Sequence, residues 1–168
     1  MTTRREVLGM ASVGVVAVAI AGRIALVPRA SKPTPGNFPV EHSEADWRAE
    51  LSPASYHVLR EGSTEKPFSS PLVEEHRKGL FACAGCDLPR FSSDTKYDSK
   101  TGWPSFWQAL PNAVSQRADN NFGMVRTEIL CSNCGGHLGH VFDDGPKPTG
   151  LRYCMNGIAL AFKPAADA

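Results

Sequence analysis

Cys131-Ser-Asn-Cys134-Gly-Gly-His137-Leu-Gly-His140 is the stretch around which the fold of this chain is organised. It holds a Cys-x-x-Cys pair followed by two histidines three positions apart. A second pair of the same spacing, Cys83-Ala-Gly-Cys86, lies upstream, and the fifth cysteine of the chain, Cys154, lies downstream. Four cysteines in two like pairs predict a metal site, and the remaining cysteine is left for chemistry.

The two Cys-x-x-Cys pairs match the ligand set of a tetrahedral zinc ion held by four thiolates. Each pair would hold one side of the ion from a tight turn, and glycines at 85, 135 and 136 would let the backbone approach closely. The pairs are too far apart for a compact zinc ribbon, so we expect them on two different hairpins. The predicted structural Zn²⁺ contributes to folding, and its ligands are Cys83, Cys86, Cys131 and Cys134.

The composition indicates one turn-rich domain built mainly from β-strands. The chain has 168 residues, 42% of them hydrophobic, and its 13 prolines and 15 glycines favour strands and turns over a helical bundle. A net charge of +1 creates no field that would attract nucleic acid. We expect the domain at 41–163, after a Pro-rich linker at 31–40 and before a short tail at 164–168.

Residues 1–30 resemble an export signal. Arg4-Arg5 precede an apolar stretch at 9–22 rich in Ala, Val and Gly, which is typical of a signal for proteins exported in the folded state through the twin-arginine route. Val7 stands where a bulky aromatic residue is common. An uncleaved membrane anchor is the alternative, but the apolar run is short for a span and Arg23 interrupts it. We expect a periplasmic location, with the protein soluble or tethered to the membrane.

Two disulfides are the alternative to zinc, because exported proteins meet an oxidising compartment. A bridge within one Cys-x-x-Cys pair closes a very small loop and constrains little chain, whereas zinc joins distant segments. Export in the folded state would also allow the metal to be loaded before the thiols are oxidised. The signal and the spacing therefore both favour zinc.

Two short helices are expected ahead of the strands. Ser43 is a suitable N-cap for a helix that reaches Leu51, and Ser52-Pro53 begins a second helix that Gly62 ends. Short runs at 79–83 and 88–94 follow, and strands are predicted at 114–116, 124–130, 138–142, 152–156 and 158–162. An aromatic-rich turn is predicted at 102–107. The fold class is therefore mainly β and antiparallel, with the helices packed at the N-terminal side.

Cys154 has no partner among the predicted metal ligands, and an unpaired thiol in an exported protein is a liability unless it is used. A free thiol is mostly protonated at neutral pH, so a nucleophile needs positive charge or hydrogen-bond donors nearby. Arg152 lies on the same strand face, and His137 and His140 would come close in the fold. The alternatives are a buried inert cysteine, and zinc-binding or structural histidines.

Residues 41–162 resemble a methionine-R-sulfoxide reductase of type B. Order and spacing agree over nearly the whole predicted domain. The turn Gly102-Trp103-Pro104-Ser105-Phe106 and the strand Leu151-Arg152-Tyr153-Cys154-Met155-Asn156 carry the resemblance, together with matching stretches at 64–68, 83–86, 91–99, 123–128 and 137–150. The resemblance implies two antiparallel β-sheets with N-terminal helices and a four-cysteine zinc site away from the catalytic pocket.

The resemblance also implies a reaction. Cys154 as a thiolate would attack the sulfur of methionine sulfoxide while an acid protonates the oxygen. The products would be methionine and a sulfenic acid on Cys154. His137 and His140 would bind the sulfoxide oxygen through water and supply a proton, and the choice of donor between them stays open. Asn156 would help to order the active-site water. The substrate is expected to be mainly protein-bound, as is general in the family.

The substrate-binding residues implied by the resemblance are Trp103, Phe142 and Arg152. The ring face of Trp103 would receive the S-methyl group and select one epimer. Arg152 is expected to favour the thiolate, with a structural salt bridge as the competing role.

Two departures from the family pattern matter. Many relatives carry a resolving cysteine just before the Gly-Trp-Pro-Ser-Phe turn, where this chain has Thr101. We therefore expect a monomeric enzyme with one reactive cysteine, which a thioredoxin-like protein or a small thiol reduces from outside. The family usually has serine after Cys-x-Asn, and Gly157 lacks that hydroxyl.

Two other classes of protein were weighed. A zinc-dependent binding module would leave Cys154 incidental, but the neutral charge and the export signal argue against nucleic acid as its partner. A thiol-disulfide oxidoreductase would use the pair Cys83 and Cys86, but that motif usually begins a helix in a βαβ setting that this chain lacks.

Overall fold

The computed structural model describes residues 38–120 and 125–166. The predicted signal at 1–30 and most of the linker lie outside the described residues. No helix among the described residues is both long and apolar enough to cross a membrane.

Two helices open the described chain, as predicted. Helix α1 spans Glu44–Glu50, and the side chain of its N-cap Ser43 accepts a hydrogen bond from the backbone of Asp46, whose carboxylate bonds back to the cap. Helix α2 spans Pro53–Glu61 with Ser52 as N-cap, and Gly62 ends it in the left-handed conformation that glycine adopts without strain. Both predicted caps are therefore confirmed.

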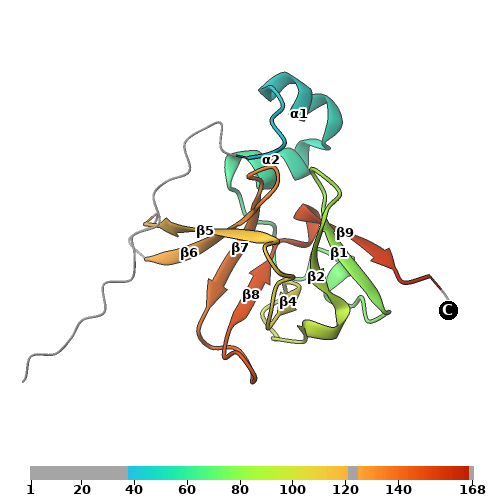
Figure 1. Ribbon diagram of the computed structural model, residues 1–168, viewed down its shortest axis with the longest axis vertical. Coiled ribbons are helices and arrows are strands. Elements are labelled where there is room, and N and C mark those ends of the chain that lie inside the picture. Colours follow the sequence, from blue (N-terminus) through green and yellow to red (C-terminus); the bar gives the residue numbers. More distant parts are fainter. Residues whose placement is uncertain (1–37, 121–124, 167–168) are drawn as a thin grey trace, which may run out of the picture.

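The strands form two antiparallel sheets, as the sequence predicted (Figure 1). The smaller sheet has the order β2-β1-β9, and the larger one the order β3-β4-β8-β7-β6-β5. The strand bounds are β1 Gly79–Cys83, β2 Pro89–Ser92, β3 Lys96–Tyr97, β4 Ser105–Phe106, β5 Val114–Asp119, β6 Arg126–Cys131, β7 His137–Phe142, β8 Arg152–Met155 and β9 Leu160–Pro164. Three short 3-10 turns join them, η1 Pro71–Val73, η2 Ser93–Thr95 and η4 Gly157–Ala159.

Two predicted elements differ from the structure. The aromatic-rich turn at 102–107 contains strand β4, because Ser105 and Phe106 pair with β8 on one side and with β3 on the other. A two-residue strand is too short to show alternation in the sequence. The strand predicted at 158–162 begins as the 3-10 turn η4 and becomes extended only at Leu160.

The hydrophobic core lies between the two sheets. Phe81 of β1 packs edge-on against Phe106 of β4, with ring centroids 5.0 Å apart, and Phe91 of β2 stacks on Phe106 at 4.4 Å. Ile129, Leu138 and Met155 from the larger sheet are fully buried in the same cluster. Because side chains alternate along a strand, the opposite face of the larger sheet is left for polar residues. That second face carries the candidate site.

Candidate active site

A single row of paired residues crosses the larger sheet at its polar face. Strand register pairs Ser105 of β4 with Cys154 of β8, Cys154 with His140 of β7, and His140 with Glu128 of β6. The row continues to Tyr97 of β3 at one end and to Arg117 of β5 at the other. Directly paired residues of antiparallel strands place their side chains on the same face, with Cβ atoms about 4.5–5.5 Å apart. The predicted nucleophile therefore lies beside one of the two predicted histidines.

A β-bulge brings His137 onto the same face. In a regular strand, residues three apart point to opposite faces. Here His137 pairs with Leu130 and Gly139 pairs with Ile129, so two residues of β7 oppose one step of β6. The extra residue shifts the alternation by one, and the rings of His137 and His140 lie with centroids 5.4 Å apart.

Gly139 is required between the two histidines. Its φ is +155°, and a Cβ at this position would lie 2.2 Å from the carbonyl oxygen of Cys154 and 2.9 Å from Cα of Met155. Any side chain would push β7 away from β8. The glycine of the His-Leu-Gly-His motif therefore keeps His140 next to Cys154.

Each histidine is held by a carboxylate. Nδ1 of His137 donates to Oε1 of Glu128 over 2.8 Å, and Nε2 of His140 donates to Oδ2 of Asp119 over 2.8 Å. An ionised carboxylate only accepts hydrogen bonds, which assigns these ring nitrogens as donors. The histidines thus use opposite nitrogens for their supports, and His137 Nε2 is buried with no hydrogen-bond partner among the described residues.

The surroundings lower the pKa of Glu128 and the pKa of His140 for different reasons. Burial raises the pKa of Glu128, but hydrogen bonds from His137 and Arg117 outweigh it and hold the pKa below its ordinary value. Burial lowers the pKa of His140, the bond to Asp119 opposes this, and Arg126 and His137 lower it further, so the net pKa is lowered. At neutral pH, His140 is therefore predominantly neutral.

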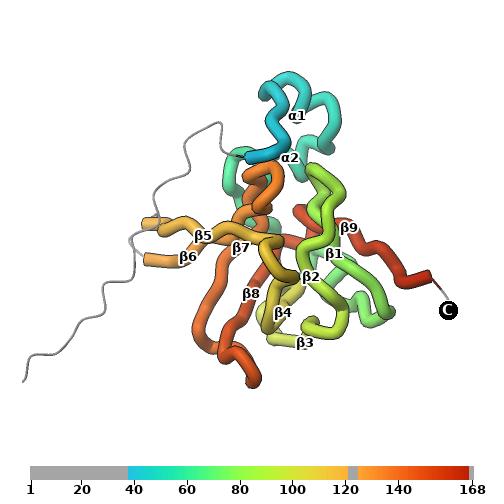
Figure 2. Tube along the Cα trace, viewed as in Figure 1, coloured from blue at the N-terminus to red at the C-terminus, as the bar shows by residue number. Residues whose placement is uncertain are grey.

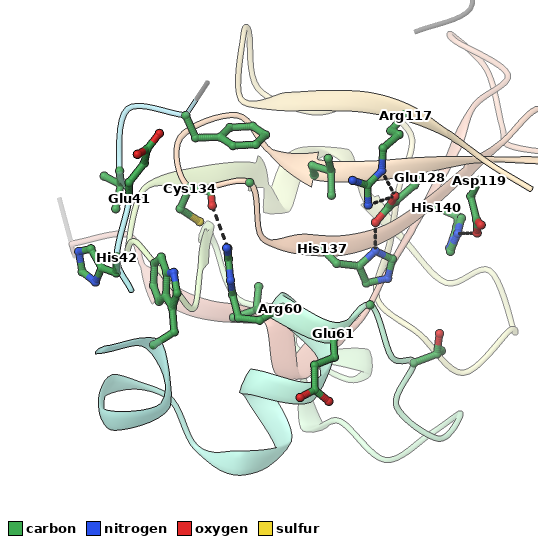
Figure 3. A pocket seen from close by; sticks show the side chains of 18 of the residues that line it. Glu41, His42, Arg60, Glu61, Arg117, Asp119, Glu128, Cys134, His137 and His140 are labelled. Atoms are coloured by element: carbon green, nitrogen blue, oxygen red, sulfur yellow. Dashed lines mark hydrogen bonds and ion pairs between the residues drawn. The ribbon is translucent and has the colours of Figure 1, made fainter. Parts of the chain in front are cut away.

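The histidines line a cavity of about 530 Å³ between helix α2, the N-terminal segment and the sheet. Figure 3 shows His137 and Glu128 on one wall with Arg117, and His140 with Asp119 farther along. Arg60 of α2 reaches across to donate to the backbone carbonyl oxygen of Cys134 over 2.9 Å. The cavity therefore runs from the histidines toward the second cysteine pair.

Cys154 is half-buried and is a free thiol. Its sulfur lies 3.8 Å from the hydroxyl oxygen of Thr101, the residue at the position of the missing resolving cysteine. Burial raises the pKa of the Cys154 thiol, and this effect outweighs the lowering by Thr101, Arg152 and Ser105. The neighbouring groups therefore favour the thiolate, but burial outweighs them and the resting cysteine is a thiol.

Arg152 is occupied by a salt bridge, which was the competing role. Its guanidinium donates twice to Asp144, with both distances 2.8 Å, and lies over the ring of Phe142 at 4.3 Å from the centroid. Register pairs Phe142 with Arg152 on the face that carries Cys154 and His140. Arg152 and Phe142 therefore lie next to the nucleophile, and the charge of Arg152 still lowers the pKa of Cys154.

Trp103 and Asn156 are both tied to Glu65, in the loop between α2 and η1. The indole Nε1 of Trp103 donates to the backbone carbonyl oxygen of Glu65 over 3.2 Å, and the backbone N–H of Glu65 donates to Oδ1 of Asn156 over 3.0 Å. Nδ2 of Asn156 donates to the carbonyl oxygen of Leu138 over 3.2 Å. These bonds fix the loop against the end of β8, and the role of Asn156 in ordering a water molecule stays a prediction.

Gly157 faces Ser70 across the same loop. A Cβ at position 157 would lie 2.0 Å from Oγ and 2.4 Å from Cβ of Ser70. The side chain of Ser70 thus fills the space where the family's usual serine would stand. The carboxylate of Glu65 accepts hydrogen bonds from the backbone N–H groups of Gly157 and Ile158 and caps the turn η4.

The four predicted metal ligands converge. Their sulfur atoms all lie within 4.8 Å of one another, with 3.7 Å between Cys83 and Cys134 and 3.5 Å between Cys86 and Cys131. Four thiolates about 2.3 Å from a tetrahedral ion would be about 3.8 Å apart, so the cluster fits zinc. The thiol hydrogen bond from Cys134 lowers the pKa of Cys131, and the one from Cys83 lowers that of Cys86. Hydrogen bonds with Cys131 raise the pKa of Cys83 and of Cys134, so the four thiols share their protons unequally.

The two cysteine pairs lie on different hairpins, as expected. One pair is in the β1–β2 hairpin of the smaller sheet and the other in the β6–β7 hairpin of the larger sheet. Figure 2 shows the green β1–β2 turn and the orange β6–β7 turn close together below the helices. A metal bound here would join the two sheets at one end.

Several site residues escaped the sequence analysis. Glu128 and Asp119 support the histidines, and Ser99 and Ser105 continue the hydrogen bonds of Thr101. An acidic residue in the otherwise apolar end of a strand, as in Glu128-Ile129-Leu130, was the one available signal for Glu128. The others depend on strand pairing, which the sequence does not show.

Comparison with known proteins adds independent findings. Residues 51–164 match the family model described as the SelR domain. A peptide methionine sulfoxide reductase MsrB of Agrobacterium fabrum is 57% identical over 126 residues, which cover 74% of this chain and 93% of that protein. Proteins of the same name from Thiobacillus denitrificans and Leptospira interrogans are 56% and 52% identical, over 73% and 76% of this chain and 93% and 98% of theirs.

Proposed function

The chain belongs to the SelR-domain family of type B methionine-R-sulfoxide reductases, and from this membership we propose a catalytic mechanism with Cys154 as the nucleophile. The observation that carries the proposal is the register of β7 and β8, which pairs Cys154 with His140 directly. His137, Phe142 and Arg152 lie on the same face. A nucleophile, proton donors and an apolar surface thus meet at one place.

In the proposed reaction, the sulfur of Cys154 attacks the sulfur of methionine sulfoxide. The attack forms a bond between the two sulfur atoms while the sulfoxide oxygen takes up a proton. The hydroxyl group then moves from the substrate sulfur to the sulfur of Cys154, and the bond between the two sulfurs breaks. Methionine is released, reduced by two electrons, and Cys154 is oxidised by two electrons to the sulfenic acid. A sulfoxide oxygen is a poor leaving group, so protonation by a positioned acid is the step that the histidines must serve. Trp103, held by Glu65, is the proposed surface for the S-methyl group.

His137 is the better candidate for the proton donor. The lowered pKa of His140 leaves that ring mostly neutral at pH 7. His137 donates through Nδ1 to the carboxylate of Glu128, which orients the ring, and its Nε2 is buried without a partner among the described residues. We assign His140 to orienting the substrate oxygen or a water molecule bound to it.

The proposed cofactor is a structural Zn²⁺ held by the four-cysteine cluster. The close approach of the four sulfur atoms and their positions in two turns support it. When bound, the ion would join the two hairpins and stabilise the fold. No step of the proposed reaction uses it.

The proposed reductant comes from outside the chain. A resolving cysteine would be expected at position 101, beside Cys154, but this chain has threonine there. The other four cysteines belong to the metal cluster. A thioredoxin-like protein or a small thiol would therefore reduce the sulfenic acid, and the enzyme is proposed to act as a monomer.

We also propose export, and hence the repair of oxidised exported proteins. The paired arginines and the apolar stretch at 9–22 support this proposal. Fractionation of cells that produce the full chain would test it, with Arg4→Lys and Arg5→Lys together as the variant. The wild type should reach the periplasm and the variant should stay in the cytoplasm; equal distribution of the two would contradict the proposal.

A stereospecific assay tests the enzymatic proposal. Purified protein is given peptides that carry the R or the S epimer of methionine sulfoxide, with a thioredoxin system or with dithiothreitol. The R peptide should be reduced and the S peptide left unchanged. Cys154→Ser should abolish the reduction while metal content and melting temperature stay close to those of the wild type. Activity in the Cys154→Ser variant would overturn the assignment of the nucleophile.

A further inference from the structure

Three hydroxyl groups beside the sulfur of Cys154 form a hydrogen-bonded chain. The Thr101 hydroxyl lies 3.8 Å from the sulfur, the Ser99 hydroxyl lies 2.8 Å from that of Thr101, and the Ser105 hydroxyl lies 2.7 Å from that of Ser99. The last hydroxyl donates to the backbone carbonyl oxygen of Trp103 over 3.2 Å. The chain therefore begins at the proposed nucleophile and ends at the residue proposed to bind the substrate.

The number of protons sets the direction of the chain. Each hydroxyl has one hydrogen to donate, whereas a carbonyl oxygen only accepts. Because Ser105 donates to the Trp103 carbonyl, Ser99 must donate to Ser105, and Thr101 must donate to Ser99. The Thr101 oxygen is then left to accept, and its partner is the S–H of Cys154. This direction suits the thiol form and satisfies four hydrogen bonds.

The thiolate form requires the opposite direction. When the proton of Cys154 leaves to solvent, the sulfur becomes an acceptor, and Thr101 can stabilise it by donating. Three hydroxyl protons then remain for four links, so one of the other links, from Thr101 to Ser99, from Ser99 to Ser105 or from Ser105 to the Trp103 carbonyl, is left without a proton. No O–H bond breaks, since each hydroxyl only rotates. Ionisation thus costs one hydrogen bond of the hydroxyl chain.

We propose that Thr101, Ser99 and Ser105 form a reversible hydrogen-bonded chain that favours the thiol form of Cys154 at rest, because ionisation costs the chain one hydrogen bond. The proposal deepens the proposed function, because it rests on Cys154 as the nucleophile. Thr101, Ser99 and Ser105 act as positioning residues. Burial raises the pKa of Cys154, while hydrogen bonds from Thr101 and Ser105 lower it when these hydroxyls turn toward the sulfur.

Other titratable groups face Cys154 and must be kept constant in a test. Arg152 lies on the same strand with its partner Asp144, His140 lies opposite on β7 with His137 beyond it, and Tyr97 lies on β3 at the end of the row. None of them belongs to the hydroxyl chain. Substitutions at 99 and 101 leave all of these side chains in place.

The hydroxyl chain predicts an unusual effect of removing the hydroxyl of Ser99, which bonds to those of Thr101 and Ser105. Ser99→Ala interrupts the chain, so Thr101 is free to donate to the thiolate while Ser105 keeps its bond to Trp103. Loss of this distant hydroxyl should therefore make Cys154 easier to ionise. In a Thr101→Val background no donor remains at position 101, so the same substitution should have no effect. A merely structural role of Ser99 would not depend on Thr101 in this way.

The test measures alkylation of Cys154 by iodoacetamide across pH in the zinc-loaded full chain, without substrate, with peptide mapping by mass spectrometry. Ser99→Ala should speed alkylation at pH 7 by about three- to tenfold, which corresponds to one neutral hydrogen bond of about 0.7–1.4 kcal/mol. The rates of the two proteins should converge at high pH. Thr101→Val and the double variant should give the same profile as each other.

Three controls complete the experiment. Thr101→Ser keeps the hydroxyl and should retain the wild-type profile. Ser69→Ala removes a hydroxyl that bonds only to the backbone of its own turn, at Lys66, and should change nothing. If Ser99→Ala does not fold, Ser99→Gly is used in its place, because it removes the same hydroxyl. The proposal is overturned if loss of the Ser99 hydroxyl leaves alkylation unchanged or slower, or if its effect persists beside Thr101→Val. Both results are independent of the activity assay with Cys154→Ser, so failure of this proposal can be told apart from failure of the proposed function.

Discussion

The imidazole rings of His137 and His140 lie on one face of β7 with their centroids 5.4 Å apart, although they are three positions apart in the chain. The β-bulge at Leu138 makes this geometry, since it adds one residue to β7 against β6. Each ring then meets its own carboxylate, Glu128 or Asp119. The carboxylates bind opposite ring nitrogens, Nδ1 of His137 and Nε2 of His140, so the two rings present different nitrogens to the site, which is the basis of the first prediction.

Replacing His137 by Asn should reduce kcat by about 10²–10⁴-fold, because it removes the proposed general acid. Glu128→Gln should reduce kcat less, because the amide oxygen can still accept the hydrogen bond that orients His137. His140→Asn should raise KM more than it lowers kcat. Steady-state kinetics against pH with one R-sulfoxide peptide measures all three. A larger loss of kcat in His140→Asn than in His137→Asn would reverse the assignment.

Replacing Thr101 by Cys should convert the enzyme to one with an internal disulfide. The Thr101 hydroxyl lies 3.8 Å from the sulfur of Cys154, so a thiol at this position can attack the sulfenic acid. Mass spectrometry after one turnover should show a bridge between the two residues in the variant, and in the wild type an oxygen or a reductant adduct on Cys154. A bridge from Cys154 to Cys83 or Cys86 in the wild type would disprove the external reductant.

Replacing Gly157 by Ser should destabilise the protein by about 1–3 kcal/mol, because the new Cβ would overlap Ser70. Adding Ser70→Gly should recover part of this loss, since it clears the space, even though it removes the cap of η1. Urea denaturation of the two single variants and the double variant measures the coupling. Strictly additive losses would show that the two positions do not compete for space.

Replacing Cys131 by Ser should lower metal content and destabilise the fold by more than about 3 kcal/mol, since structural zinc is worth about 10–16 kcal/mol in small peptides. Cys154→Ser is the matched control, because it removes one thiol outside the cluster. Metal analysis together with thermal denaturation distinguishes the two. If the Cys131 variant keeps its metal and its melting temperature, the four-cysteine site is not structural zinc.

The free energy of unfolding should fall as the pH drops below about 6.5, the ordinary pKa of histidine. Burial lowers the pKa of folded His140, so the unfolded chain binds the proton first and acid favours unfolding. The loss continues until the pH passes the lowered pKa of the folded state, and one such group contributes at most about 1.4 kcal/mol per pH unit. His140→Asn should reduce this slope in urea denaturation between pH 7 and 5. An unchanged slope would show that burial does not lower the pKa of His140 in the folded protein.

Residue type and local spacing sufficed for part of this protein. Two Cys-x-x-Cys pairs imply a tetrahedral site because each pair needs only its own turn to present two sulfurs. The helix caps at Ser43, Ser52 and Gly62 likewise depend on bonds within four residues and were predicted correctly. The fifth cysteine stood out because it was left over. For the same reason, the sequence alone indicated which sulfur to propose as the nucleophile.

The pairing of strands decided the rest, because it joins residues far apart in the chain. Cys154 meets His140, and His140 meets Glu128, through register that no local pattern encodes. The bulge at Leu138 places His137 on the reactive face, against the alternation that its spacing would dictate. The hydroxyl chain from Thr101 to Ser105 likewise exists only where β4 lies against β8. Only the tertiary structure therefore determined how the reactive sulfur is supported, since its neighbours come from four different strands and a loop.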